Sequence, residues 1–368
     1  MSEAREAFQG IYSLDYQKAY DELLQLRQKH PQHPAPPLYL ATVKWLAELF
    51  QRQNLDLDLF LAPGYFAEEG EREMPEKDRE AFFRFLEESR EKSQTILEQN
   101  PGNKDARYFL GAYYGIRASF AITIDHSVKQ AFDFGKKAYK QHHELVEEDP
   151  DYYDAYMSVG LYEYIVGNLP WYIKWLASIL GYSGSEKRGF EYLDTAKEKG
   201  AYVRDDAAVL QMVLFVREKR YPEALEIARS MHGRYPRNFL LHINQAQILE
   251  MMEEYGRSVE VYRAVLQLAD QEQENYDQLD ANPFRYKVAA KFEQMGKTQA
   301  ALRELRAIIA DPRATHSQRV TAHLYAGRLH ERYHRPREAA SHYQAVLACE
   351  NHGNSHDQAR LGLERTRE

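Results

Sequence analysis

Cysteine and tryptophan are scarce in this chain of 368 residues, and long apolar runs are absent. The single cysteine, Cys349, excludes an internal disulfide framework and any CxxC zinc or redox motif. No stretch reaches the roughly 18 apolar residues that a membrane-spanning helix needs. The first residues, MSEAREAF, contain no apolar signal-peptide core. We therefore expect a cytoplasmic protein, or a periplasmic or secreted one if an export signal has been removed.

Motifs of nucleotide binding, nucleophilic catalysis and nucleic-acid binding are also missing. No glycine-rich phosphate loop follows a strand, no strand pattern is visible, and no nucleophile stands in a recognisable elbow or triad. No dense basic run or basic–aromatic motif appears. The sequence therefore predicts neither an enzyme nor a cofactor, metal or nucleic-acid site.

The chain is rich in apolar residues and in tyrosine, with 44% hydrophobic residues and 27 Tyr. This composition is sufficient for a continuous core and argues against disorder. The net charge of −8 is uneven, because residues 283–368 hold 15 Lys or Arg and nine Asp or Glu, a net +6, which leaves −14 for residues 1–282. The basic end predicts contact with an acidic partner or with the acidic part of another copy. Solvated helix faces would explain the same charges.

A helical-hairpin pattern recurs along the chain, most clearly in its second half. Tyr221 and Tyr255 lie 34 residues apart, with Ala224 and Ser258 at the same offset after them. A helix-turn-helix unit with this period cannot bury its apolar face alone and must stack on its neighbours. Met231 and Pro236 complete the hairpin that contains Tyr221, and three further groups occupy similar offsets: Tyr16, Ala19 and Pro31; Met295, Thr298 and Leu302; and Gly327, Ala339 and Tyr343.

Longer and less regular units separate the first hairpin from the regular ones. Helical periodicity predicts helices over Leu38–Gln51, Glu76–Gln99, Asp105–Ala121, Ser127–Glu148, Tyr152–Val166 and Glu186–Lys199. The link Asn54–Pro75 is an insertion. A second insertion at 169–181 is apolar, and a short final helix is expected near Ser355–Arg367.

These residues and spacings resemble the tetratricopeptide-repeat superfamily over essentially the whole chain. The resemblance implies an all-α fold, a right-handed α-α superhelix of about eight helical hairpins, as one domain over residues 1–368. Irregular hairpins would fill 1–200, regular repeats 201–350 and a C-terminal helix 354–368. It also implies a non-catalytic scaffold that binds a protein or peptide partner in a concave groove lined by the first helices.

The central unit carries a second, weaker resemblance. Gly160, Leu169-Pro170, Leu180–Gly184 and Arg188–Leu193 are similar to the long central unit of certain tetratricopeptide proteins. These include uncharacterised bacterial proteins and a eukaryotic family linked to inclusion and lipid handling. The shared pieces are short and apolar, so they bear on topology more than on function.

The candidate partner-binding residues lie on the first helices. Tyr offers a large contact area and a hydroxyl, which suits a groove but equally suits a wide core. A chaperone-type carboxylate clamp would require Lys and Asn at offsets where this chain has Val209, Val213, Asp280 and Phe284, so only Asn244 fits. The candidates are Tyr108, Tyr113, Tyr156, Tyr162, Asn244 and Lys287.

The apolar insertion predicts an additional helix with one strongly apolar face. Trp171 and Trp175 lie on that face, and we expect it to be mostly buried against the repeats. An exposed helix of this kind would instead favour a peripheral membrane adaptor, although it carries only one Lys, Lys174.

The only catalytic pattern is His330-Glu331-Arg332-Tyr333-His334, which matches HExxH. On a continuous helix the two imidazoles would share a face and bind zinc, with the Glu as general base of a metallopeptidase. Pro336 is expected to end the helix just past His334, and the glycine and third histidine of the extended motif are replaced by Arg337 and Ala340. A histidine-rich hairpin is the simpler interpretation.

Overall fold

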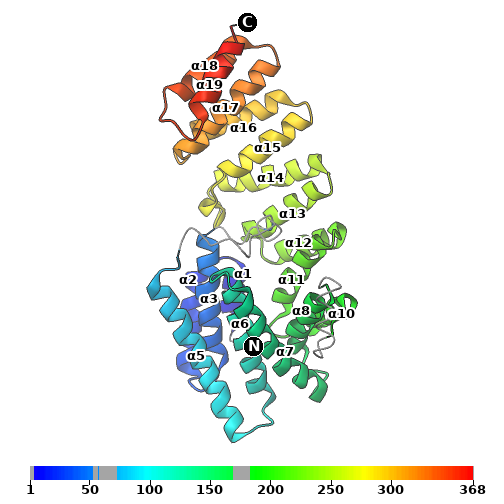
Figure 1. Cartoon of the computed structure of the whole chain (residues 1–368). Helices are drawn as coiled ribbons and strands as arrows, with labels where there is room; N and C mark the ends of the chain where they lie inside the picture. The colour runs from blue at the N-terminus through cyan, green and yellow to red at the C-terminus, as the bar shows by residue number, and fades with distance from the viewer. Residues whose placement is uncertain (1–3, 53–56, 58–72, 169–182, 368) are drawn as a thin grey trace. The chain divides into compact units, whose positions relative to one another are not determined.

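The computed structural model describes residues 4–52, 57, 73–168 and 183–367, and these residues form helices and no strands (Figure 1). They divide into two compact units, Met1–Asn244 and Gln245–Glu368, here called unit 1 and unit 2. The prediction of an all-α fold is confirmed. The prediction of one domain over residues 1–368 stays a prediction.

Unit 1 is built from consecutive antiparallel helices, and the predicted helix bounds are confirmed to within a few residues. Glu76–Gln99 and Glu186–Lys199 begin and end as expected. The helices are α1 Arg5–Tyr12, α2 Tyr16–Lys29, α3 Ala35–Gln51, α5 Glu76–Gln99, α6 Lys104–Thr123, α7 Val128–Glu148, α8 Tyr156–Gly167, α10 Glu186–Lys199, α11 Arg204–Arg217 and α12 Tyr221–Arg234, with the 3₁₀ turn η2 at Tyr153–Ala155.

Unit 2 continues the same alternation, and helix α13, Phe239–Met251, contains the division between the units. Its other helices are α14 Tyr255–Asp270, α15 Asn282–Gln294, α16 Thr298–Ala310, α17 His316–Arg332, α18 Pro336–Leu347 and α19 Ser355–Arg365, with the 3₁₀ turn η3 at Tyr276–Gln278. Over the described residues the helices pair as eight hairpins followed by α19, which agrees with the predicted number.

One turn geometry recurs between the two helices of a hairpin. Two residues before the second helix, a residue adopts a left-handed conformation with φ of 55° to 70°. The amide after it donates to the carbonyl five residues earlier over 2.7 to 2.9 Å, which closes the first helix with the longer bond of a Schellman motif. This turn occurs at Leu14, Lys219, Glu253, Gly296 and His334.

The first and the last helices of unit 1 pack against each other around a shared core. The Asn238 side chain donates to the carbonyl of Tyr12 over 2.7 Å, and the rings of Tyr12 and Tyr235 lie 5.1 Å apart. The rings of Phe50 and Phe239 are 5.9 Å apart. Helices α1 and α3 therefore pack against the last helices of the same unit, and one apolar cluster runs from α1 to α11.

A buried carboxylate fixes the segment that leads into α11. Oδ1 of Asp154 accepts hydrogen bonds from the backbone amides of Ala201, Tyr202 and Val203 at 2.8, 2.6 and 3.1 Å. Burial raises the pKa of Asp154, while these amide bonds lower it. The three donors satisfy the charge where the chain turns into the centre of unit 1.

Candidate protein-binding surface

Two of the predicted groove residues belong to the core of unit 1. Tyr108 is 2% exposed and its ring stacks on that of His142 at 5.1 Å. Tyr113 is 6% exposed and its hydroxyl donates to Glu87 over 2.6 Å. Burial raises the pKa of both hydroxyls, and the bond to Glu87 raises that of Tyr113 further. Tyr108 and Tyr113 therefore fill the wide core of unit 1 and do not line an open groove.

The other two tyrosines lie partly exposed on α8. The Tyr156 hydroxyl donates to the carbonyl of Pro150 over 3.0 Å, and burial raises its pKa. The Tyr162 ring stacks on Tyr139 of α7 at 3.9 Å. Both remain predicted contacts, but their rings already join α8 to neighbouring helices.

The structure describes two of the four remaining candidates, Asn244 and Lys287, and not the two tryptophans. Asn244 lies in α13 and is 7% exposed, so little of it is open to a partner. Lys287 lies partly exposed in α15, with Nζ 5.9 Å from the centre of the Phe284 ring, and it remains a predicted contact. Trp171 and Trp175, and the insertion that carries them, lie outside the described residues.

The structure brings together a set of aromatic rings and cations that were not predicted. The guanidinium carbon of Arg117, on α6, lies 4.7 Å from the centre of the Phe83 ring on α5 and 4.7 Å from that of Phe134 on α7. Nζ of Lys137 lies 5.4 Å from the Phe134 ring and 5.5 Å from that of Tyr114. Three helices thus supply one alternating series of rings and cations.

One further cation shares the Phe83 ring, and a separate cation–ring pair lies beside Lys137 on α7. Arg79 lies 5.2 Å from the Phe83 ring, and Lys136 lies 5.4 Å from the Phe132 ring. We call the whole set the cation–aromatic face: Arg79, Phe83, Tyr114, Arg117, Phe132, Phe134, Lys136 and Lys137. Each such contact contributes about 0.5–1 kcal/mol at an exposed site.

The cations of this face differ in their acidic partners. Arg79 is paired with Asp125, its Nη1 lying 2.7 Å from Oδ1. Arg117 and Lys137 form no ion pair and no hydrogen bond with the residues that the structure describes. The Arg117 Nε is buried and has no acceptor there. Two positive charges thus lie against rings without a direct ion pair, although Glu87 is close enough to Arg117 for the arginine to lower the pKa of its carboxyl.

The adjoining end of α7 is unusually exposed for an ordered helix. None of its first ten residues, 128–137, is buried, and Val128 and Phe132 are 61% and 47% exposed. Buried positions begin at Ala138. Apolar side chains displayed beside cations are typical of surfaces that bind other proteins, where Arg and aromatic residues carry much of the affinity.

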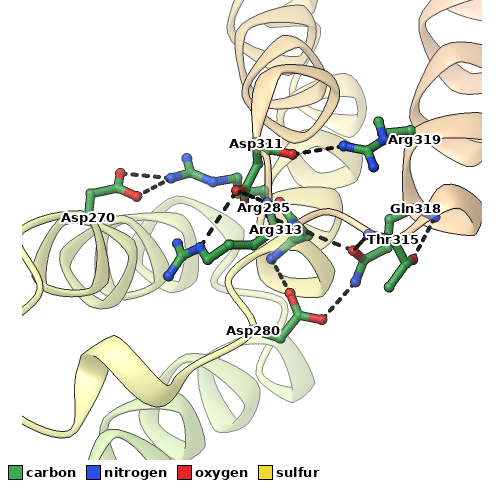
Figure 2. A network of polar contacts seen from close by, with 9 residues as sticks. Asp270, Asp280, Arg285, Asp311, Arg313, Thr315, Gln318 and Arg319 are labelled. Carbon is green, nitrogen blue, oxygen red and sulfur yellow. Dashed lines mark hydrogen bonds and ion pairs between the residues drawn. The ribbon is translucent and has the colours of Figure 1, made fainter.

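A polar network in unit 2 pairs most of its charged groups within the fold. Arg285 bonds both carboxylate oxygens of Asp270 at 2.5 and 2.7 Å, and Gln318 donates to Asp280 over 2.7 Å (Figure 2). Thr315 and Gln318 form a capping box at the start of α17. Asp280, which stands at an offset of the carboxylate clamp, is thus engaged within the fold. We interpret this network as joining helix ends.

The HExxH pattern does not form a zinc-binding helix. Helix α17 ends at Arg332, so His334 lies beyond it in the left-handed turn position, with φ of 55°. The Glu331 carboxylate accepts a hydrogen bond from the Tyr343 hydroxyl over 2.7 Å and pairs with Arg365. No group of three or more His, Cys, Asp or Glu in the described chain is arranged to hold a metal ion.

His330 instead belongs to a small histidine cluster between α17 and α18. It is 3% exposed and stacks on His342 at 5.5 Å, while Nδ1 of His342 lies 3.0 Å from Nδ1 of His323. Burial, followed by repulsion from the other two rings, lowers the pKa of His342 to about 4. Burial also lowers the pKa of His330 and His323, so the cluster is uncharged at neutral pH.

Replacing His334 with glycine is expected to stabilise the protein by about 1 kcal/mol, because glycine adopts the left-handed conformation without the steric cost of a β-carbon. Urea unfolding of the full chain measures this. The reverse change, Gly296→Ala, is the matched control: it occupies the same turn position with open space around it, and should destabilise by a similar amount. Loss of stoichiometric zinc from tag-free His334→Gly protein would instead restore the metallopeptidase interpretation.

Over the described residues, no helix combines the length and the apolar character needed to cross a bilayer. Cys349 is a free cysteine and is partly exposed. The membrane-adaptor alternative rested on residues 169–181, which lie outside the described residues.

No protein-family model matches the chain, and no curated protein matches it. Among solved structures it is similar to a tetratricopeptide repeat protein from Parabacteroides merdae, with 11% identity and a TM-score of 0.35 over 80% of this chain and 97% of that one. It is similar to the human IFIT1 dimer with PPP-AAAA, with 15% identity and a TM-score of 0.35 over 98% and 76%. It is also similar to yeast Tom70, with 12% identity and a TM-score of 0.34 over 97% and 86%.

Similarities this low support no conclusion about function. The fold is assigned from the helices and turns of this chain. Its helices alternate as consecutive hairpins, its interhelical turns repeat one geometry, and Lys219 and Glu253 occupy that turn 34 residues apart. The chain has an all-α helical-repeat fold of the tetratricopeptide kind.

Proposed function

We propose that this protein is a non-catalytic scaffold that binds a protein or peptide partner. A single observation carries the proposal: the cation–aromatic face holds Arg117 and Lys137 against rings, and neither forms an ion pair or a hydrogen bond in the described chain. A fold that needed these charges only for stability would be expected to pair them, as it pairs Arg79 with Asp125.

The proposal moves the binding surface away from the expected groove. Tyr108 and Tyr113 are buried in the core of unit 1, whereas the exposed part of α7 displays Phe132 beside Lys136. Arg and aromatic side chains are enriched among the residues that dominate protein–protein affinity. The same surface carries no arrangement of nucleophile and base that would suggest catalysis.

A photo-crosslinking residue placed at Phe132 tests this function. Phe132 is 47% exposed, so the substitution should leave the fold intact, and we expect irradiation in cells to produce a discrete covalent adduct with one protein. The matched control is Leu361 on α19, which is 53% exposed and outside the face, and it should give no such adduct. Equal adducts from both positions, or none from Phe132, would contradict the proposed surface.

A further inference from the structure

We propose that the cation–aromatic face binds an acidic segment of the partner, with one carboxylate on Arg117, a second anionic group at Lys137 and an apolar side chain on Phe132. This inference rests on the proposed function, because it names what the same surface binds. It differs from a groove-binding mode, since the residues that carry it come from α5, α6 and α7 and exclude the buried tyrosines.

The chemistry of Arg117 selects the ligand group. A guanidinium carries five N–H donors in a plane, and ring contacts engage its faces while leaving in-plane donors for an anion. The rings of Phe83 and Phe134 lie 4.7 Å from its central carbon, and the described chain offers its donors no acceptor. A carboxylate matches such a fork with two parallel hydrogen bonds.

Lys137 supplies the second charge. It is exposed on α7 and shares the Phe134 ring with Arg117, so both cations lie against one aromatic side chain. Lysine has three donors on a flexible stem and acts as a point charge, which accepts a carboxylate in many orientations. A segment with acidic residues close together can therefore satisfy both cations at once.

The exposed apolar residues of α7 extend the recognition. Phe132 and Val128 are exposed one turn apart, and Lys136 lies 5.4 Å from the Phe132 ring. An aliphatic or aromatic side chain of the partner would bury this area while its acidic neighbours reach the cations. The expected segment thus combines Asp or Glu with an adjacent large apolar residue.

The charge of the chain argues against a nucleic acid at this face. The protein carries −8 overall and −14 over residues 1–282, which contain the whole face. A polyanion gains affinity by neutralising many phosphates and would be repelled by such a surface beyond a few contacts. Two unpaired cations suit a few carboxylates.

The test begins with selection of random twelve-residue peptides displayed on phage against the immobilised full chain. The enriched peptides should share Asp or Glu next to an aromatic or aliphatic residue. One enriched peptide, labelled with fluorescein, is then titrated with the wild type and variants by fluorescence anisotropy. We expect Arg117→Gln to weaken binding at least tenfold, about 1.4 kcal/mol, and Lys137→Gln to weaken it about threefold.

Arg220→Gln is the matched control. The Arg220 guanidinium also lies against two rings, 4.2 Å from Phe215 and 5.0 Å from Phe190, but it is paired with Glu223 at 2.9 Å. Its loss should leave the peptide affinity unchanged. Lys137 is exposed, so Lys137→Gln remains informative if Arg117→Gln lowers the melting temperature.

The outcomes separate the two proposals. Enriched peptides without acidic residues, or binding that neither variant weakens, would overturn the acidic-segment inference and leave the scaffold function standing. Failure to enrich any peptide would overturn both. Tighter binding of a labelled twenty-nucleotide single-stranded DNA, also lost in Arg117→Gln, would overturn the inference in favour of a nucleic-acid surface.

Discussion

Replacing Gly189 with alanine is expected to cost about 3 kcal/mol of stability, among the largest effects of a single methyl group in this chain. Helices α8 and α10 approach so closely here that a β-carbon on Gly189 would lie 2.8 Å from the amide nitrogen of Tyr164 and 2.9 Å from the carbonyl oxygen of Gly160. Backbone atoms cannot rotate away as side chains do, so the helices must separate, and overpacking of this kind costs about 1–3 kcal/mol or more.

The same contact makes Gly160 sensitive, because its β-carbon would lie 2.9 Å from the Gly189 carbonyl oxygen. Gly115, in the middle of α6, is the matched control, since nothing lies within 4 Å of a β-carbon there. Gly115→Ala should be neutral or stabilise by up to about 1 kcal/mol, because alanine favours helix. Urea unfolding of the three variants decides the matter, and a Gly189→Ala curve that overlays the Gly115→Ala curve would contradict the close approach of α8 and α10.

Acid should weaken unit 1 through histidines whose pKa burial lowers, and His142 is the most buried of them. His142 is 2% exposed, its Nε2 lies 2.9 Å from the carbonyl oxygen of Tyr108, and its Nδ1 lies 2.7 Å from the Ser158 hydroxyl oxygen. The carbonyl can only accept, so Nε2 carries the proton and Nδ1 accepts from the serine. Burial lowers the pKa of His142 to about 4, while its bond to Tyr108 raises it.

The direction in which stability changes with pH follows from the pKa of His142 in the unfolded and folded states. The unfolded histidine has a pKa near 6.5, so between about pH 6.5 and 4 the unfolded chain binds more protons than the folded one. The stabilisation that neutral His142 provides is present above about pH 6.5 and is lost as the pH falls toward 4. A shift from about 6.5 to 4 corresponds to about 3 kcal/mol.

Comparison with variants isolates this contribution. Buried Asp154 and Asp206 have raised pKa values, chiefly because of burial, and they act in the opposite direction by binding protons in the folded state. The free energy of unfolding should therefore be measured at about pH 7 and pH 5, on either side of the unfolded pKa, for the wild type and for His142→Gln. The variant should be less stable at neutral pH and less sensitive to acid. His143→Gln, one residue along α7 and partly exposed, should keep the wild-type dependence. Equal dependence in both variants would contradict the assignment.

Much of the fold was predictable because local signals decide it. Apolar periodicity and the proline that follows the second helix in several hairpins located the helices closely, and the spacing of Tyr221 and Tyr255 identified the repeat. The left-handed turn residues were not predictable, because only Gly296 among the five is glycine. Leu14 and His334 adopt this conformation because the helices on either side impose it.

The candidate surface could not be predicted for a different reason. Phe132, Phe134, Lys136 and Lys137 stand within six residues and were the one signal in the sequence, but the other members are spread from Arg79 to Arg117. Only the packing of α5, α6 and α7 brings Phe83 and Phe134 to the same guanidinium. Conversely, the tyrosines that suggested a groove are abundant because unit 1 has a wide core to fill, as the burial of Tyr108 shows.

The central claim is that the partner binds across α5, α6 and α7, and hydrogen–deuterium exchange of the full chain with and without the enriched peptide tests it most directly. Bound peptide should slow exchange in the exposed first turns of α7, around residues 128–137, and in the segments that carry Arg79, Phe83 and Arg117. Unit 2 and α10 should be unchanged. Protection confined to unit 2, or to the part of α6 around Tyr108 and Tyr113 without any in α7, would contradict the account.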